Sequence, residues 1–186
     1  MGGFISDDME FIIVLNRSYK TNGYRYVVSK CINGIIESND DFYNDIYDES
    51  LSKVMVSVNQ VVYSNYFSKN TFQAMSNHEI DVMMEEFVNA GLSIDIYDLK
   101  FYNDSILKYN LEKELKNIKA KSLIIGSSDN LFHSSKFDSI PLSNSISNSK
   151  LVLFDSKRDY TDIEDYSPFE KELSGIFGRI QKIKYN

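Results

Sequence analysis

The chain has 186 residues, of which 42% are hydrophobic and 25% are charged, and its formal net charge is −7. This composition is typical of a soluble globular domain, and no apolar run approaches the length of a membrane span. Scattered lysines and arginines under a net negative charge argue against a nucleic-acid surface, so we expect neither nucleic acid nor membrane as a partner. The first residues lack the features of a signal peptide and Cys31 is the single cysteine, so we expect a cytoplasmic protein.

The first predicted element is a strand, and a long helical stretch follows it. The run Phe11–Leu15 is apolar and rich in branched residues, which favours a buried β-strand. Apolar residues at helical spacing predict helices over 26–37, 48–66, 79–90 and 97–109, with a short helical turn over 71–75. Gly91 stands where a glycine commonly ends a helix. Cys31 lies in the first helical stretch, and we interpret it as a small buried hydrophobe.

Two short apolar runs, 122–126 and 151–155, predict further strands in the last third of the chain. The first run ends at Gly126 and leads into Asp129, and parallel α/β sheets place their chemistry at such strand ends. A helix-like tail over 168–184 closes the chain. The sequence therefore predicts an α/β fold, with an incomplete parallel sheet of about three strands and a large helical insertion.

We expect a single domain over residues 1–186. In this interpretation, residues 1–18 and 115–186 form a part made of sheet and helices, and residues 19–114 form a helical lid inserted into it. A large helical insertion after a strand of a parallel sheet is the arrangement of a lid.

Three segments are similar to a known family: Met1-Gly2-Gly3, the helical stretch 77–110 with Ile-Tyr-Asp-Leu-Lys-Phe-Tyr at 96–102, and the run 115–132. In that order they resemble the residues after the nucleophile, the lid, and the acid-bearing run of homoserine O-acetyltransferases, a branch of the α/β-hydrolases. The last segment, from Leu-Lys-Asn-Ile-Lys-Ala to Asp-Asn-Leu-Phe, is the most specific. The resemblance covers the C-terminal portion of the family. It implies an ancestral acyl-transfer or ester-hydrolysis activity and places Asp129 at the catalytic acid position.

The chain departs from that family at the other two members of a Ser-His-acid triad. The family's serine would precede Met1, and the loop over 155–163 contains no histidine. Without an imidazole to remove the serine proton, Asp129 alone does not activate a hydroxyl. The two histidines are His78, interpreted as a helix-capping residue, and His133. His133 is close enough in sequence to approach Asp129, but its simpler interpretation is a surface residue near a helix start.

Other patterns that carry chemistry are weak in this chain. Ser127 and Ser128 fit a turn better than a nucleophile. The acidic residues at 40–48 lack the spacing of a calcium loop, and no Cys/His cluster suits zinc. Gly2-Gly3 does not form a phosphate loop, because no strand precedes it and no lysine follows. We therefore expect no cofactor and no metal.

Three functional hypotheses remain. The leading one is a catalytically silent or degenerate homoserine O-acetyltransferase-like α/β-hydrolase remnant that is inactive alone. The second is a non-enzymatic binding or oligomerisation module, since a truncated sheet leaves an unpaired edge. The third is the C-terminal half of a split acyltransferase. The expected partners are thus a second copy in a homo-oligomer, such as a dimer, or a complementary N-terminal chain.

Overall fold

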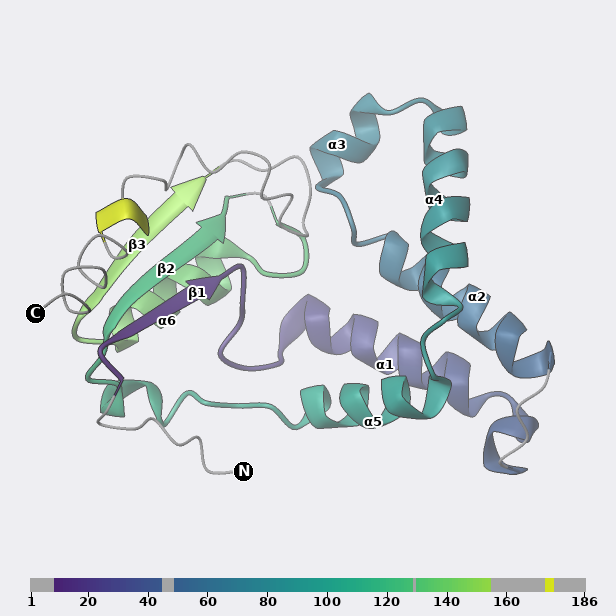
Figure 1. Ribbon diagram of the computed structural model, residues 1–186, viewed down its shortest axis with the longest axis horizontal. Helices are drawn as coiled ribbons and strands as arrows, with labels where there is room; N and C mark the ends of the chain where they lie inside the picture. Colours follow the sequence, from purple (N-terminus) through teal and green to yellow (C-terminus); the bar gives the residue numbers. More distant parts are fainter. Residues whose placement is uncertain (1–8, 45–48, 129, 155–172, 176–186) are drawn as a thin grey trace, which may run out of the picture.

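The computed structural model describes residues 9–44, 49–128, 130–154 and 173–175 (Figure 1). Strands β1 (Phe11–Leu15), β2 (Lys121–Ser127) and β3 (Ser149–Phe154) form a parallel sheet in the order β1-β2-β3. Within the sheet, Ile124 lies opposite Val14 of β1 and Leu151 of β3. The predicted α/β class, with a three-stranded parallel sheet, is therefore confirmed.

The central strand β2 is the most buried of the three. Ile124 packs on one face of the sheet against Leu142, in helix α6 (Ile140–Ser145), and its neighbours Leu123 and Ile125 pack on the other face. All three of these β2 side chains are buried. A strand that is paired along both edges and covered on both faces needs a continuous apolar run, which is the pattern that predicted it.

Gly126 allows α6 and the turn before it to lie close to the sheet. A β-carbon at this position would overlap the side chain of Ser139, the last residue of the π-helical turn η3 (Ser135–Ser139). A short 3-10 turn, η2 (Leu115–Asn117), precedes β2. We call β1, η2, β2, η3, α6 and β3 the sheet region.

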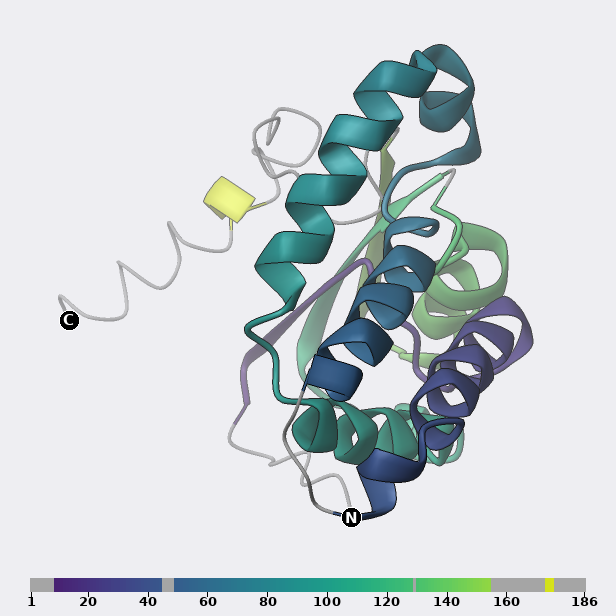
Figure 2. The same ribbon diagram turned by 90° about the vertical axis from the view of Figure 1, so that its right-hand side faces the viewer.

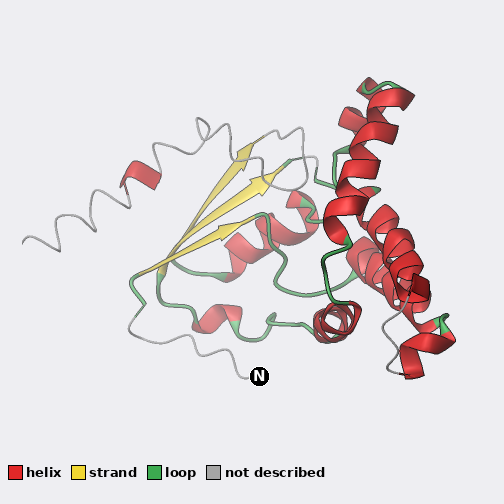
Figure 3. Ribbon diagram, turned by 45° about the vertical axis from the view of Figure 1, so that its right-hand side comes forward, coloured by secondary structure: helices red, strands yellow, loops and turns green. Residues whose placement is uncertain are grey.

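The remaining described helices gather beside the sheet (Figures 1 and 3). They are α1 (Gly23–Glu37), the 3-10 turn η1 (Asp40–Asn44), α2 (Glu49–Tyr63), α3 (Lys69–Ala74), α4 (Asn77–Gly91) and α5 (Ile96–Leu107). We call them the helical region. Helix α1 packs against α2 and α5, and α2 packs against α4 (Figure 2). The predicted helices are confirmed, with ends that differ by a few residues.

Side-chain caps set the starts of three helices. Ser76 and Glu79 form a reciprocal capping box at α4, in which the Glu79 amide donates to the Ser76 hydroxyl at 3.2 Å. Asp95 caps α5 by accepting from the backbone amide of Tyr97 at 2.8 Å. Ser68 caps α3. These polar residues explain why each helix begins where it does.

In the helical region, one sequence-based interpretation is wrong, and another holds for a different physical reason. Helix α4 ends at Gly91 as expected, but Gly91 does not have the left-handed backbone of a typical glycine cap; among the described glycines only Gly23 has a positive φ. A β-carbon at Gly91 would instead overlap Asn59 of α2, so close helix packing requires the glycine. Cys31 is exposed, because α1 turns its face with Val28 and Ile32 inward.

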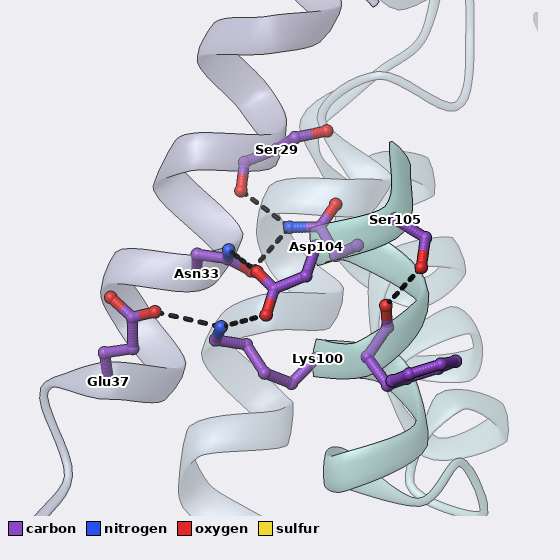
Figure 4. Close-up of polar contacts among 8 residues, drawn as sticks. Ser29, Asn33, Glu37, Lys100, Asp104 and Ser105 are labelled. Atoms are coloured by element: carbon purple, nitrogen blue, oxygen red, sulfur yellow. Dashed lines mark hydrogen bonds and ion pairs between the residues drawn. The ribbon is translucent and has the colours of Figure 1, made fainter. Parts of the chain in front are cut away.

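A polar network joins α1 to α5 (Figure 4). Lys100 contacts Glu37 at 3.0 Å and Asp104 at 2.6 Å, and Asp104 accepts from the Asn33 amide at 2.6 Å. The buried Asn103 amide donates to the Asn33 side chain and to the Ser29 carbonyl, both at 2.7 Å. A charged cluster thus lies over a buried amide pair, and together they fix the two helices side by side.

The two chain segments that link the regions run next to each other. Lys20 and Asn110 form an isolated antiparallel bridge, and the Lys20 ammonium contacts Glu112 at 2.7 Å. The Leu111 amide donates to the Tyr19 carbonyl at 2.8 Å. The outgoing and returning segments are therefore held together at the base of the helical region.

No helix among the described residues is both long and apolar enough to cross a membrane. The predicted tail helix over 168–184 lies outside the described residues except for 173–175, which are helical.

Candidate functional site

A cavity of about 500 Å³ lies between the helical region and the loop that follows β2. Its apolar wall comes from helices α1, α2, α4 and α5, with Phe132 added from the loop. Its polar lining includes Arg17, Arg25, Asn59 and His133. Ligand sites commonly have about this size and this mixture of apolar walls and few polar groups. We call this space the central cavity.

The loop after β2 carries His133 to the central cavity. The Asn130 side chain accepts from the backbone amides of Phe132 at 2.9 Å and of His133 at 2.5 Å, which fixes the turn. The His133 Nδ1 atom lies 3.0 Å from the Ser18 hydroxyl, which follows β1. Both side chains are buried. The ends of two neighbouring parallel strands therefore bring together a serine and a histidine that are 115 positions apart in the sequence.

The surroundings of His133 keep its imidazole neutral. Burial, followed by the positive charges of Arg25 and Arg17, lowers the pKa of His133 from 6.5 to about 3. Burial raises the pKa of the nearby Asp138, although a hydrogen bond from Ser18 opposes that change. The Ser18 hydroxyl therefore interacts with both Asp138 and the His133 Nδ1 atom.

This arrangement differs from a Ser-His-acid triad. In a triad the imidazole accepts the serine proton and the acid contacts the other ring nitrogen. Here the acid, Asp138, contacts the serine, and burial beside Arg25 and Arg17 makes the His133 imidazole a poor proton acceptor.

The predicted acid, Asp129, lies outside the described residues, as do Met1-Gly2-Gly3 and the loop over 155–163. Ser127 is the buried last residue of β2, and its amide donates to the Asn16 side chain at 2.7 Å, so its interpretation as a turn residue is wrong. Ser128, the next residue, lies in a turn, as expected. His78 is exposed in the first turn of α4, as its interpretation as a capping-region residue requires.

The interpretation of His133 as a surface residue is wrong, because Ser18 and the helical region cover it. Sequence reasoning also missed Arg17 and Arg25 as residues of the site. Arg17 follows β1 by two positions, so the rule that strand ends carry function could have identified it. The described residues contain no group of three or more His, Cys, Asp or Glu side chains that could hold a metal.

The parallel sheet, the helices that follow its first strand and the cavity at its strand ends are those of part of an α/β-hydrolase fold. The enzyme MGS-M2, an α/β hydrolase from a Medee basin deep-sea metagenome library, superposes with a TM-score of 0.67 at 18% identity. That match covers 91% of this chain and 56% of that one. No protein-family model matches the chain.

Acyl-transferring proteins are also similar to this chain. The homoserine O-acetyltransferase of Bacillus anthracis superposes with a TM-score of 0.73 at 15% identity, over 89% of this chain and 52% of that one. A probable acyltransferase of Methanothermobacter thermautotrophicus is 26% identical over 186 residues, covering 96% of this chain and 57% of the relative. The predicted resemblance is confirmed for the fold, and the chain spans about half the length of these relatives.

Proposed function

We propose that this chain is a catalytically silent relative of α/β-hydrolase acyltransferases that retains a ligand cavity beneath a helical lid. The observation that carries the proposal is the state of its two histidines. His133 is buried with a pKa of about 3, and His78 is exposed on α4, outside the lining of the central cavity.

The chemistry of acyl transfer explains why these histidines matter. An imidazole with a pKa of about 3 is roughly three orders of magnitude less basic than an unperturbed one, so His133 removes a serine proton poorly. The guanidinium groups of Arg17 and Arg25 do not accept protons near neutral pH. The central cavity therefore offers a place to bind a ligand but no effective general base among the residues that line it.

An esterase assay tests this proposal directly. The purified chain is incubated with p-nitrophenyl acetate, and separately with acetyl-CoA and homoserine. We expect product formation at the rate of the buffer, unchanged by Ser18→Ala or His133→Gln. Turnover by the unmodified chain that His133→Gln abolishes, while the matched surface change His78→Gln leaves it intact, would refute catalytic silence.

A second candidate function is assembly through the edge of β1. Among the described residues β1 pairs with β2 alone, and the side chain of Ile13 on this strand is 41% exposed. An exposed strand edge favours pairing with another strand. The proposed partner is a second copy in a homo-oligomer or a complementary N-terminal chain.

Sedimentation velocity tests the assembly. We expect a concentration-dependent dimer that Ile13→Lys weakens, because a lysine on an edge strand opposes pairing. A monomer at all concentrations would exclude the homo-oligomer. In that case, co-expression with a chain that supplies a nucleophile elbow tests the split acyltransferase, whose signature is restored ester hydrolysis.

A further inference from the structure

We infer that the central cavity binds a monocarboxylate with an apolar tail, and that Arg17 and Arg25 hold the carboxylate. The inference rests on the proposed function in one respect, since it treats the cavity as a place of binding and not of turnover. Three features of the cavity support it: unbalanced positive charge, buried polar atoms without partners, and an apolar wall.

The charge of the lining is positive. Arg17 and Arg25 are the charged residues among those that line the cavity, and no carboxylate of a described residue joins them there. Arg17 is exposed, whereas Arg25 is partly buried, and this burial lowers the pKa of Arg25. The buried Asp138 does not line the cavity, although its charge opposes the lowering of the Arg25 pKa. A negatively charged group in the cavity would offset the cost of two neighbouring cations.

Polar atoms at the cavity are buried without partners. The Nε atom of Arg25 and the side-chain nitrogen of Asn59 are both buried, and neither has a hydrogen-bond partner among the described residues. Asn59 as a whole is only 4% exposed and packs against Gly91, so its amide is fixed at the wall. Buried donors in native proteins are nearly always satisfied, so a ligand oxygen is the expected partner of the Arg25 Nε atom.

The geometry of Arg25 suits a carboxylate. Its guanidinium lies 5.6 Å from the centre of the Phe132 ring, an arrangement that restrains the group. Arginine presents two parallel N–H donors, which match the two oxygens of a carboxylate. Arg25 also lies in the first turn of α1, a 15-residue helix whose N-terminus favours negative charge.

The rest of the lining suits a hydrocarbon tail. Apolar side chains from four helices surround the cavity, among them Val28, Ile32, Val58, Val62, Phe87 and Ile106. The arginines lie at the end nearer the sheet, after β1 and at the start of α1. A ligand that fits both the arginine end and the apolar part of the cavity is negatively charged at one end and apolar along the rest. A medium-chain fatty acid has these properties.

Calorimetric titration of the full chain with octanoate tests the inference. We expect saturable one-to-one binding, with octanol, octylamine and acetate each binding at least about tenfold more weakly, because each lacks the charge or the tail. Octanol binding as tightly as octanoate would overturn the role of the arginines. Acetate or inorganic phosphate binding as tightly as octanoate would overturn the role of the tail.

Arg25→Gln and Arg17→Gln should each weaken octanoate binding about tenfold or more without changing octanol binding. Lys53→Gln, which removes an exposed cation on α2, is the matched control and should change neither. Arg17 is exposed, so its variant is expected to fold even if Arg25→Gln does not. Unchanged octanoate affinity in Arg17→Gln would refute the assignment.

The two proposals fail separately. Ester turnover with octanoate binding intact would overturn catalytic silence alone. Absence of octanoate binding, with no turnover, would overturn the carboxylate site alone.

Discussion

The sheet region and the helical region are held together by different kinds of contact. In the sheet region, Ile124 and its neighbours on β2 are buried in apolar surroundings on both faces. In the helical region, the interface of α1 and α5 contains the buried amides of Asn33 and Asn103, and a cavity lies beside it. The sheet region is thus filled with apolar side chains, which stabilise the fold. The helical region instead contains a cavity and buried polar side chains, which a fully packed apolar interface would lack.

The largest expected effect comes from the centre of the sheet. Ile124→Ala should lower the free energy of unfolding by about 3–5 kcal/mol, since it removes buried methyl groups and leaves a cavity. Urea denaturation measures the loss. Val82→Ala, at a residue of α4 that is 42% exposed, is the control and should change stability by less than about 0.5 kcal/mol. Similar losses at both positions would contradict the packing of β2.

The second effect is a pH dependence of the free energy of unfolding that arises from His133, where the sheet region meets the helical region. The folded-state pKa of His133 is about 3, below its ordinary 6.5, because of burial and then Arg25 and Arg17. Between these pH values the unfolded chain binds a proton that the folded chain does not. Stability from this group is therefore complete above pH 6.5 and is lost as the pH falls toward 3.

The difference between the unmodified chain and His133→Gln isolates that contribution. The advantage of the unmodified chain should fall by about 2–4 kcal/mol from pH 7 to pH 4, as measured by urea denaturation at each pH. The raised pKa of Asp138 has the opposite effect on stability: its contribution is present at low pH and is lost as the pH rises above 3.8. Because the unmodified chain and His133→Gln both contain Asp138, this contribution cancels in the difference between them. Parallel pH curves would show that His133 is not buried as described.

A third change separates the two regions most clearly. Asn103→Ala should cost about 1–3 kcal/mol, because the Asn33 side chain and the Ser29 carbonyl lose their donor. Hydrogen exchange should speed up in α1 and α5 and stay unchanged in β2. Lys53→Ala, in an exposed pair with Glu49, is the control and should have almost no effect. Equal loss of protection in β2 would mean that the two regions unfold as one.

The smallest effect is expected at the start of α4. Ser76→Ala removes the capping box with Glu79 and should cost about 1 kcal/mol, with faster hydrogen exchange confined to the first turn of α4. Ser57→Ala, at an exposed position within α2, is the matched control. If both variants exchange alike, the cap does not stabilise α4.

The strands and helices could be predicted because their signals are local. The apolar run of β2 and the helical spacing of α2 are visible in a few neighbouring residues, and the class of the fold follows from their order. The start of α1 at Gly23 was placed too late, because the apolar spacing becomes regular only within the helix.

The site could be predicted only in part, because it depends on contacts between distant residues. His133 is buried by Ser18, which is 115 positions away, and no nearby residue indicates this. The place of Arg25 in the cavity likewise depends on how α1 meets the loop after β2. The strand-end rule led to Asp129, and the same rule applied to β1 would have led to Arg17.

Asn16 directs the chain out of the sheet and into the helical region. It has a φ of 41°, its amide donates to the Ile125 carbonyl at 2.8 Å, and its side chain accepts from the Ser127 amide. Only glycine, asparagine and aspartate adopt this backbone readily, and of these glycine has no side chain to reach Ser127. The direction in which the polypeptide leaves the sheet toward all the helices that follow is thus fixed by one asparagine, through its backbone and its side chain together.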